Sequence, residues 1–91
     1  MINVPELGFD VVATVTSQQG SCEFDYKVGD EVRFCGKTIE GTTCMGAMTC
    51  LVPAAYALKY GAAFPWESDK SRLIVACPDA GNPVVFELKR Q

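Results

Sequence analysis

Cysteine is the residue type that offers the most chemistry in this chain, and three of the five cysteines fall where an element is expected to begin or end. Cys22 follows the first expected strand, Cys44 opens the expected helix, and Cys77 ends the third expected strand. At a helix N-terminus the unpaired backbone N–H groups and the helix dipole favour a thiolate, so Cys44 is the leading candidate for a nucleophile, ligand or redox thiol. We therefore predict a metal or redox site formed by these three cysteines.

The spacing of the cysteines does not support this prediction by itself. The chain contains no C-x-x-C pair, and its spacing matches no zinc or iron–sulfur signature. Three thiolates also leave a closed zinc site one ligand short, so Asp79, a solvent molecule or a neighbouring subunit would have to complete it. Each cysteine can instead be a small buried hydrophobe, which is our interpretation of Cys35 and Cys50.

Methionine and aromatic side chains offer two further kinds of site. Met45 and Met48 lie close to Cys44 in sequence, and this soft donor set would suit Cu(I), although methionine on an apolar helix more often fills a core. Four aromatic residues either line an aromatic pocket or cover the central helix, and covering is the commoner role. They are Tyr56, Tyr60, Phe64 and Trp66.

The carboxylates and the missing histidine limit acid–base chemistry. Asp30 and Asp79 stand in turn sequences, where an aspartate usually accepts hydrogen bonds from the backbone of its own turn. Nothing in their spacing, or in that of Glu67, requires a paired-carboxylate mechanism. Because the chain has no histidine, it lacks the usual general base near neutral pH and the commonest zinc ligand.

Charge and composition exclude other functions. The net charge of -3 and the absence of a basic cluster argue against nucleic-acid binding, which requires a positive surface. The N-terminus has neither the basic region nor the apolar region of a signal peptide, so we expect a cytoplasmic protein with reduced thiols. Charged residues are slightly sparse at 21%, which favours burial of apolar surface in a homo-oligomer.

The expected elements are four strands around one helical segment. Alternating or continuous apolar residues predict strands at 9–16, 31–35, 71–77 and 84–90, in the order ββαββ. The segment 71–77 is nearly all apolar, which is typical of a central strand covered on both faces. The last two strands are expected to form an antiparallel hairpin, while residues 37–40 are at most a short extended piece.

The central segment, residues 41–60, carries no charge before Lys59 and predicts a helix. Thr42 or Thr43 is expected to cap it, and Pro53 is expected to kink it or divide it into two short helices. Its threonines, glycines and proline make it a buried core helix rather than a membrane span. The loop containing Phe64 and Trp66 is expected to fold back over it.

These elements predict a single α+β domain over residues 1–91. A four-strand, mostly antiparallel sheet would pack on one kinked central helix. The alternative is a small SH3-like β-barrel with an inserted helix, because the sequence Val28-Gly29-Asp30-Glu31-Val32 also occurs at strand entries in such barrels. The length of 91 residues leaves no room for a second domain.

The combination of FPWE at 64–67, ACPD at 76–79 and PVVFEL at 83–88, together with Lys27-Val28-Gly29-Asp30, resembles a family of small uncharacterised prokaryotic proteins, common in anaerobic bacteria and archaea. The resemblance spans nearly the whole chain and includes the three candidate cysteines, but it implies no established activity or cofactor. Relatives often carry histidine where this chain has Tyr26.

Three functional hypotheses follow from the sequence. The first is an oligomeric binding protein that holds a metal or redox ligand through Cys22, Cys44 and Cys77. The second is a structural or interaction subunit without chemistry, which uses the apolar helix and the FPWE loop as an interface. The third is a small enzyme with Cys44 as nucleophile, whose base would be a carboxylate, tyrosine or lysine. The one cofactor that these hypotheses include is a metal ion bound by thiolates, and the small-molecule ligand is unknown.

Overall fold

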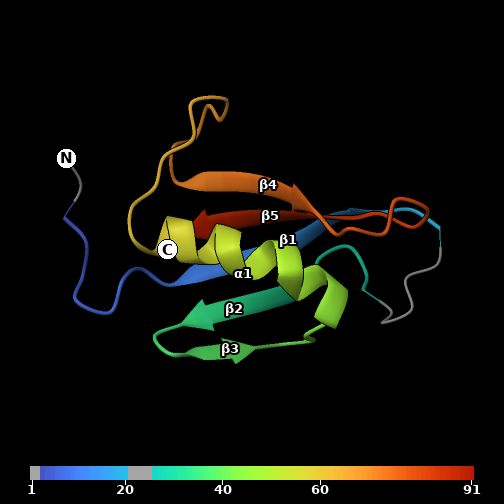
Figure 1. Cartoon of the computed structure of the whole chain (residues 1–91), viewed down its shortest axis with the longest axis horizontal. Helices are drawn as coiled ribbons and strands as arrows, with labels where there is room; N and C mark the ends of the chain where they lie inside the picture. Colours follow the sequence, from blue (N-terminus) through green and yellow to red (C-terminus); the bar gives the residue numbers. More distant parts are fainter. Residues whose placement is uncertain (1–2, 21–25) are drawn as a thin grey trace.

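The computed structural model describes residues 3–20 and 26–91, and it has an α+β fold (Figure 1). In chain order, the described elements are β1 (Val11–Gln18), β2 (Glu31–Cys35), β3 (Thr38–Glu40), α1 (Met45–Lys59), β4 (Arg72–Ala76) and β5 (Val84–Arg90). The α+β class expected from the sequence is therefore confirmed, with five strands in place of the expected four.

The strands form one antiparallel sheet in the order β3-β2-β1-β5-β4, and α1 packs against β1, β4 and β5 (Figure 1). Strands β3 and β4 are the two edges of the sheet. The sheet is therefore open in the described part of the chain, and the alternative of a closed SH3-like barrel is wrong. Because α1 lies across one face, residues that face it form the core.

The additional strand is β3, which pairs with β2 across a turn at Gly36 and Lys37. The side chains of β3 are exposed, so its sequence carries no alternation of apolar and polar residues that would indicate a strand. Backbone pairing forms it instead, helped by a hydrogen bond from the Thr38 hydroxyl to the Cys35 carbonyl at 2.8 Å. A strand of this kind can be recognised only once its partner strand is in place.

Most of the buried residues that the sheet contributes to the core lie in the central strands β1 and β5. In β1, Val11, Ala13 and Val15 are buried, as the alternation predicted, and in β5 Val84, Phe86 and Leu88 are buried. The two strands pair antiparallel along most of their length, with Ala13 opposite Leu88. Alternation identified both strands because each has one face against α1.

The expectation of a central position for the third predicted strand is wrong. Strand β4 pairs with β5 in the predicted antiparallel hairpin, but it forms the edge of the sheet, and Ile74 is 43% exposed. Leu73 alone in this strand is buried. The apolar residues of 71–77 lie on two faces, one packed against α1 and one facing solvent. In so short a strand, periodicity alone cannot distinguish this arrangement from burial on both faces.

Helix α1 is a single helix that contains Pro53, so the alternative of two short helices is wrong. Ala47, Leu51, Ala55 and Leu58 form its buried stripe. Pro53 lies on the exposed side, where water can bind the Thr49 carbonyl that a proline leaves without its N–H partner. The structure offers, in the residues that it describes, no helix with the length and apolar character that a membrane crossing requires.

Candidate functional site

The three cysteines predicted to form a site have different positions in the structure. Cys22 lies outside the described residues. Cys44 is the residue that precedes α1, Cys77 follows β4, and both are partly buried against the core. Among residues 3–20 and 26–91, no three His, Cys, Asp or Glu side chains are placed to hold a metal ion. A site that includes Cys22 stays a prediction.

Cys77 and its neighbouring turn form a closed hydrogen-bonded unit. The backbone N–H of Val84 donates to the Cys77 sulfur at 3.2 Å, and the Cys77 N–H donates to the Val84 carbonyl at 2.9 Å. Asp79 accepts the N–H groups of Gly81 and Asn82, at 3.1 and 3.2 Å, as expected for a turn aspartate. These contacts give the sulfur and the carboxylate structural roles at the end of the β4–β5 hairpin.

The N-terminus of α1 is held by Tyr26 rather than by a threonine. The Cys44 N–H donates to the Tyr26 hydroxyl at 3.1 Å, and that hydroxyl donates to the Thr42 carbonyl. The residue that caps the helix is Cys44, whose side chain makes no capping bond, so the prediction of a Thr42 or Thr43 cap is wrong. Sequence patterns missed this role because the capping oxygen comes from a distant aromatic side chain.

Replacing Tyr26 with phenylalanine is expected to lower the free energy of unfolding by about 1 kcal/mol, because the partly buried Cys44 N–H and the Thr42 carbonyl both lose their hydrogen bond to the Tyr26 hydroxyl. The Tyr26 ring is buried and meets Phe86 edge-on, at 5.3 Å between ring centroids, so phenylalanine preserves the packing. Chemical denaturation measures the effect. Tyr56→Phe, at an exposed tyrosine, is the control, and an equal loss in both variants would contradict the role of Tyr26.

The FPWE loop is fixed by Glu67 and Lys70. Glu67 is the buried charged residue of the described chain, and it accepts hydrogen bonds from the Arg72 side chain and the Ile74 N–H, both at 3.3 Å. The Lys70 ammonium donates to three carbonyls of the loop at 2.7 to 3.3 Å, those of Phe64, Pro65 and Glu67. These bonds give Glu67 a structural role at the edge of the sheet.

The aromatic residues of this loop do not both cover the helix. Phe64 packs against the core, but Trp66 is 70% exposed, so the expected covering by Trp66 is wrong. Next to this loop, the Ser71 hydroxyl and backbone N–H, with Lys89, hold the pKa of Asp69 well below its usual range. The hydrogen bonds and ion pairs of this region therefore stabilise the loop itself.

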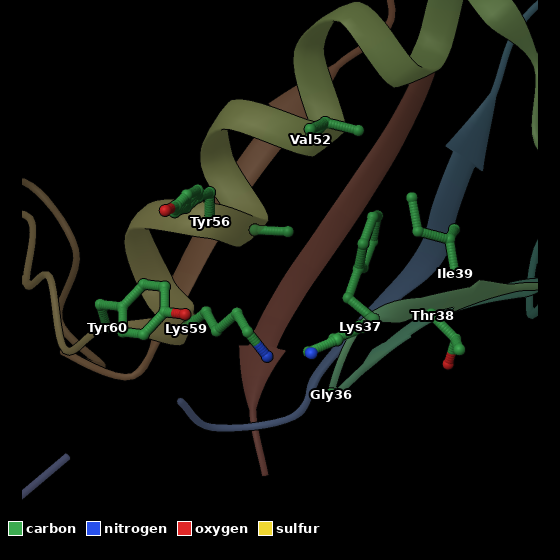
Figure 2. Close-up of a pocket in the computed structure, with 10 residues that line it drawn as sticks. Gly36, Lys37, Thr38, Ile39, Val52, Tyr56, Lys59 and Tyr60 are labelled. Carbon is green, nitrogen blue, oxygen red and sulfur yellow. The ribbon is translucent and has the colours of Figure 1, made fainter. Parts of the chain in front are cut away.

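A pocket of about 340 Å³ lies between α1 and the β2–β3 hairpin (Figure 2). Its lining is mostly apolar and aromatic, with two lysines, and includes these side chains: Phe34, Lys37 and Ile39 from the hairpin, and Val52, Tyr56, Lys59 and Tyr60 from α1 and its end. Part of the predicted aromatic pocket is thus present, formed by Tyr56 and Tyr60 without Phe64 or Trp66. Such lining is typical of a small-molecule site.

The Lys59 ammonium is the unusual group of this pocket. Its nitrogen is buried and has no hydrogen-bond partner among the residues that the structure describes. The ring of Tyr60 lies 6.0 Å away, which is a weak cation–π contact. In Figure 2 the amino groups of Lys59 and Lys37 point toward one another across the pocket. No carboxylate of residues 3–20 or 26–91 hydrogen-bonds the Lys59 ammonium.

This arrangement is suited to binding an anion. Ammonium groups can hold a carboxylate or phosphate by charge-assisted hydrogen bonds, and the apolar walls can hold the body of the same molecule. Neither lysine was a candidate site residue in the sequence, because Lys37 fell in the possible extended piece at 37–40 and Lys59 in the helical segment 41–60. The available signal was that Lys59 is the first charge after a long uncharged segment.

Comparisons with known proteins give no match. No family model matches the chain, and no curated protein or solved structure matches it. The resemblance to a family of small prokaryotic proteins therefore stays a prediction. The function has to be inferred from the pocket and from the side chains around it.

Proposed function

We propose that this protein binds a small organic anion with a planar apolar body in the pocket between α1 and the β2–β3 hairpin. The observation that supports this most directly is the buried Lys59 ammonium, which has no hydrogen-bond partner in the described chain. A buried charge without a partner costs several kcal/mol, and proteins normally pair such groups. A ligand carboxylate would supply the missing partner.

The remaining walls of the pocket indicate the rest of the ligand. Phe34, Val52 and Ile39 are apolar, and Tyr56 and Tyr60 add aromatic rings to the lining. The pocket volume of about 340 Å³ is at the lower end of the range for small-molecule sites, which favours a compact ligand. Lys37 is exposed at the rim, where it can form a second, solvent-screened contact with the anion. The best fit is an aromatic carboxylate.

Titration with 2-naphthoate and with the neutral 2-naphthamide tests this proposal. We expect the carboxylate to bind at least about 10-fold more tightly than the amide, because only the carboxylate can pair with Lys59. Amide chemical shifts from isotope-labelled protein would place the ligand, with changes expected around Thr38 and Tyr60, on the two sides of the pocket.

Lys27→Met tests whether 2-naphthoate is attracted by positive charge in general rather than by the pocket, because Lys27 is exposed and lies outside the pocket lining. Its affinity for 2-naphthoate should equal that of the unchanged protein. Equal affinities for the carboxylate and the amide would contradict the proposal, as would shift changes confined to surfaces away from the pocket.

Two functions expected from the sequence stay predictions. A cysteine-based metal or redox site depends on Cys22, which lies outside the described residues, together with Cys44 and Cys77. Association of two copies through the FPWE loop is consistent with the exposure of Trp66, but single exposed aromatic residues are common on monomers. The pocket is favoured over both because it contains a buried ammonium group that hydrogen-bonds to no residue in the part of the chain that the structure describes.

A further inference from the structure

The N-terminal arm, residues 3–9, lies against the end of α1 that carries Lys59 (Figure 1). The Phe9 N–H donates to the Lys59 carbonyl at 2.8 Å, and the Gly8 N–H donates to the Pro5 carbonyl at 2.9 Å, which closes a turn in the arm. This turn places the arm backbone directly beside the Lys59 side chain. The arm is therefore a neighbour of the proposed anion site.

The contact between Gly8 and Lys59 leaves no room for a side chain at position 8. Gly8 has a φ of 76°, and a Cβ atom there would lie 2.5 Å from Lys59 Cγ and 3.2 Å from Lys59 Cε. The arm backbone thus packs on the lysine stem up to the carbon that carries the ammonium. The ammonium nitrogen, which is the next atom along this stem, is buried.

The arm is held by few interactions. Beyond the Phe9 hydrogen bond, the Arg90 guanidinium lies 5.5 Å from the centroid of the Phe9 ring. Residues 3–7 of the arm are exposed, and Leu7 is 56% exposed. Arg90 also donates to the Leu58 and Ala62 carbonyls, so the end of α1 stays fixed if the arm moves away. Segments with so few buried contacts open more readily than the sheet does.

We propose that the N-terminal arm is a strap over Lys59, which opens to admit the anion to the ammonium and closes against the lysine stem again. The proposal rests on the proposed function of the pocket. With the strap closed, the ammonium nitrogen is buried, so a ligand first meets the exposed Lys37 and reaches Lys59 only after the strap opens. Binding then has two steps, with encounter at the rim followed by pairing at Lys59.

Amide hydrogen exchange of the unliganded protein tests the opening directly. The Phe9 amide reports the strap, and the Leu88 amide, at a fully buried residue of β5, reports the sheet. We expect Phe9 to exchange at least about 100-fold faster than Leu88 relative to their intrinsic rates. We also expect saturating 2-naphthoate to slow exchange at Phe9. Equal protection of the two amides would overturn the strap, because the arm would then open only with the whole fold.

Phe9→Ala tests whether opening limits ligand entry. Loss of the ring beneath Arg90 should loosen the strap and raise the association rate constant for 2-naphthoate about 10-fold, consistent with a cation–π contact of ordinary strength. Leu7→Ala, which removes an exposed arm side chain, is the control and should leave the rate unchanged.

The outcomes separate the strap from the proposed function. An unchanged association rate in Phe9→Ala, with binding that still prefers the carboxylate over the amide, would overturn the strap and leave the anion site intact. Lys59 would then reach the ligand by rotation of its own side chain. Equal binding of 2-naphthoate and 2-naphthamide, or binding of neither, would overturn the proposed function and the strap with it.

Discussion

Replacing Lys59 with methionine is expected to weaken binding of 2-naphthoate about 100-fold and, at the same time, to stabilise the unliganded protein. The binding loss follows from removal of a charge-assisted hydrogen bond in a buried site. The gain in the free energy of unfolding should be about 1 to 2 kcal/mol, because methionine fills the space of the lysine stem without burying an unpaired charge. Opposite effects on stability and binding are the signature of a residue retained for a ligand.

Chemical denaturation with and without 2-naphthoate measures both effects. Lys37→Met is the matched comparison in the same pocket, and because Lys37 is exposed it should weaken binding less than 10-fold and leave stability nearly unchanged. A Lys59→Met protein that is less stable and still binds the carboxylate would contradict the assignment. Lys59 would then act only through the packing of its aliphatic stem.

Replacing Glu67 with alanine is expected to lower the free energy of unfolding by about 3 kcal/mol. The change removes an acceptor that is only 7% exposed and leaves the Arg72 side chain and the Ile74 N–H without it. Arg72 keeps a longer contact with Glu87 at 3.5 Å, which limits the loss. The Ile74 N–H would be left at the open edge of β4, so the variant should also self-associate more readily.

Glu31→Ala is the matched control for this prediction. Glu31 pairs with Arg33 at 2.8 Å, a shorter distance than in the Glu67 pair, but both side chains are about half exposed. Its removal should change the free energy of unfolding by less than about 0.5 kcal/mol. Chemical denaturation and sedimentation measure the two consequences. Equal stability losses in the two variants would show that burial of Glu67 contributes nothing.

Lys59 and Glu67 are charged groups that differ in whether the described chain supplies hydrogen-bond partners for them. The Glu67 carboxylate accepts hydrogen bonds from an arginine and from the backbone, so its charge is matched within the chain. The Lys59 ammonium has no comparable partner in the described residues. The first arrangement stabilises a loop and a sheet edge, whereas the second leaves the pocket ready for an anion.

Much of the fold could be predicted from the sequence because it depends on local periodicity. Alternating apolar residues located β1 and β5, where the residues of one face are buried and those of the other face are mostly less buried, apart from Val12 in β1. The uncharged segment located α1, and turn residues located the β4–β5 hairpin. Each of these features reflects a pattern of burial that neighbouring residues in sequence share.

Other features escaped prediction because they depend on pairing and packing between elements. The short extended piece expected at 37–40 becomes the strand β3 through its pairing with the neighbouring β2, and the edge position of β4 depends on the order of strands in the sheet. The cap of α1 comes from Tyr26, which no local capping pattern includes. In each case the sequence around the element was compatible with more than one environment.

Cys44 at the start of α1 is an example of a feature that the sequence determined, and Lys59 at the end of α1 is an example of one that only the tertiary structure decided. The residue types and periodicity of the chain were enough to specify an α+β domain and to mark Cys44 as a thiol at a helix terminus. Only the tertiary structure brought Lys37 and Lys59 to one pocket and covered the Lys59 stem with the arm at Gly8. The physical reason is that burial of a long side chain, and the absence of a partner for its charge, depend on every element packed around it.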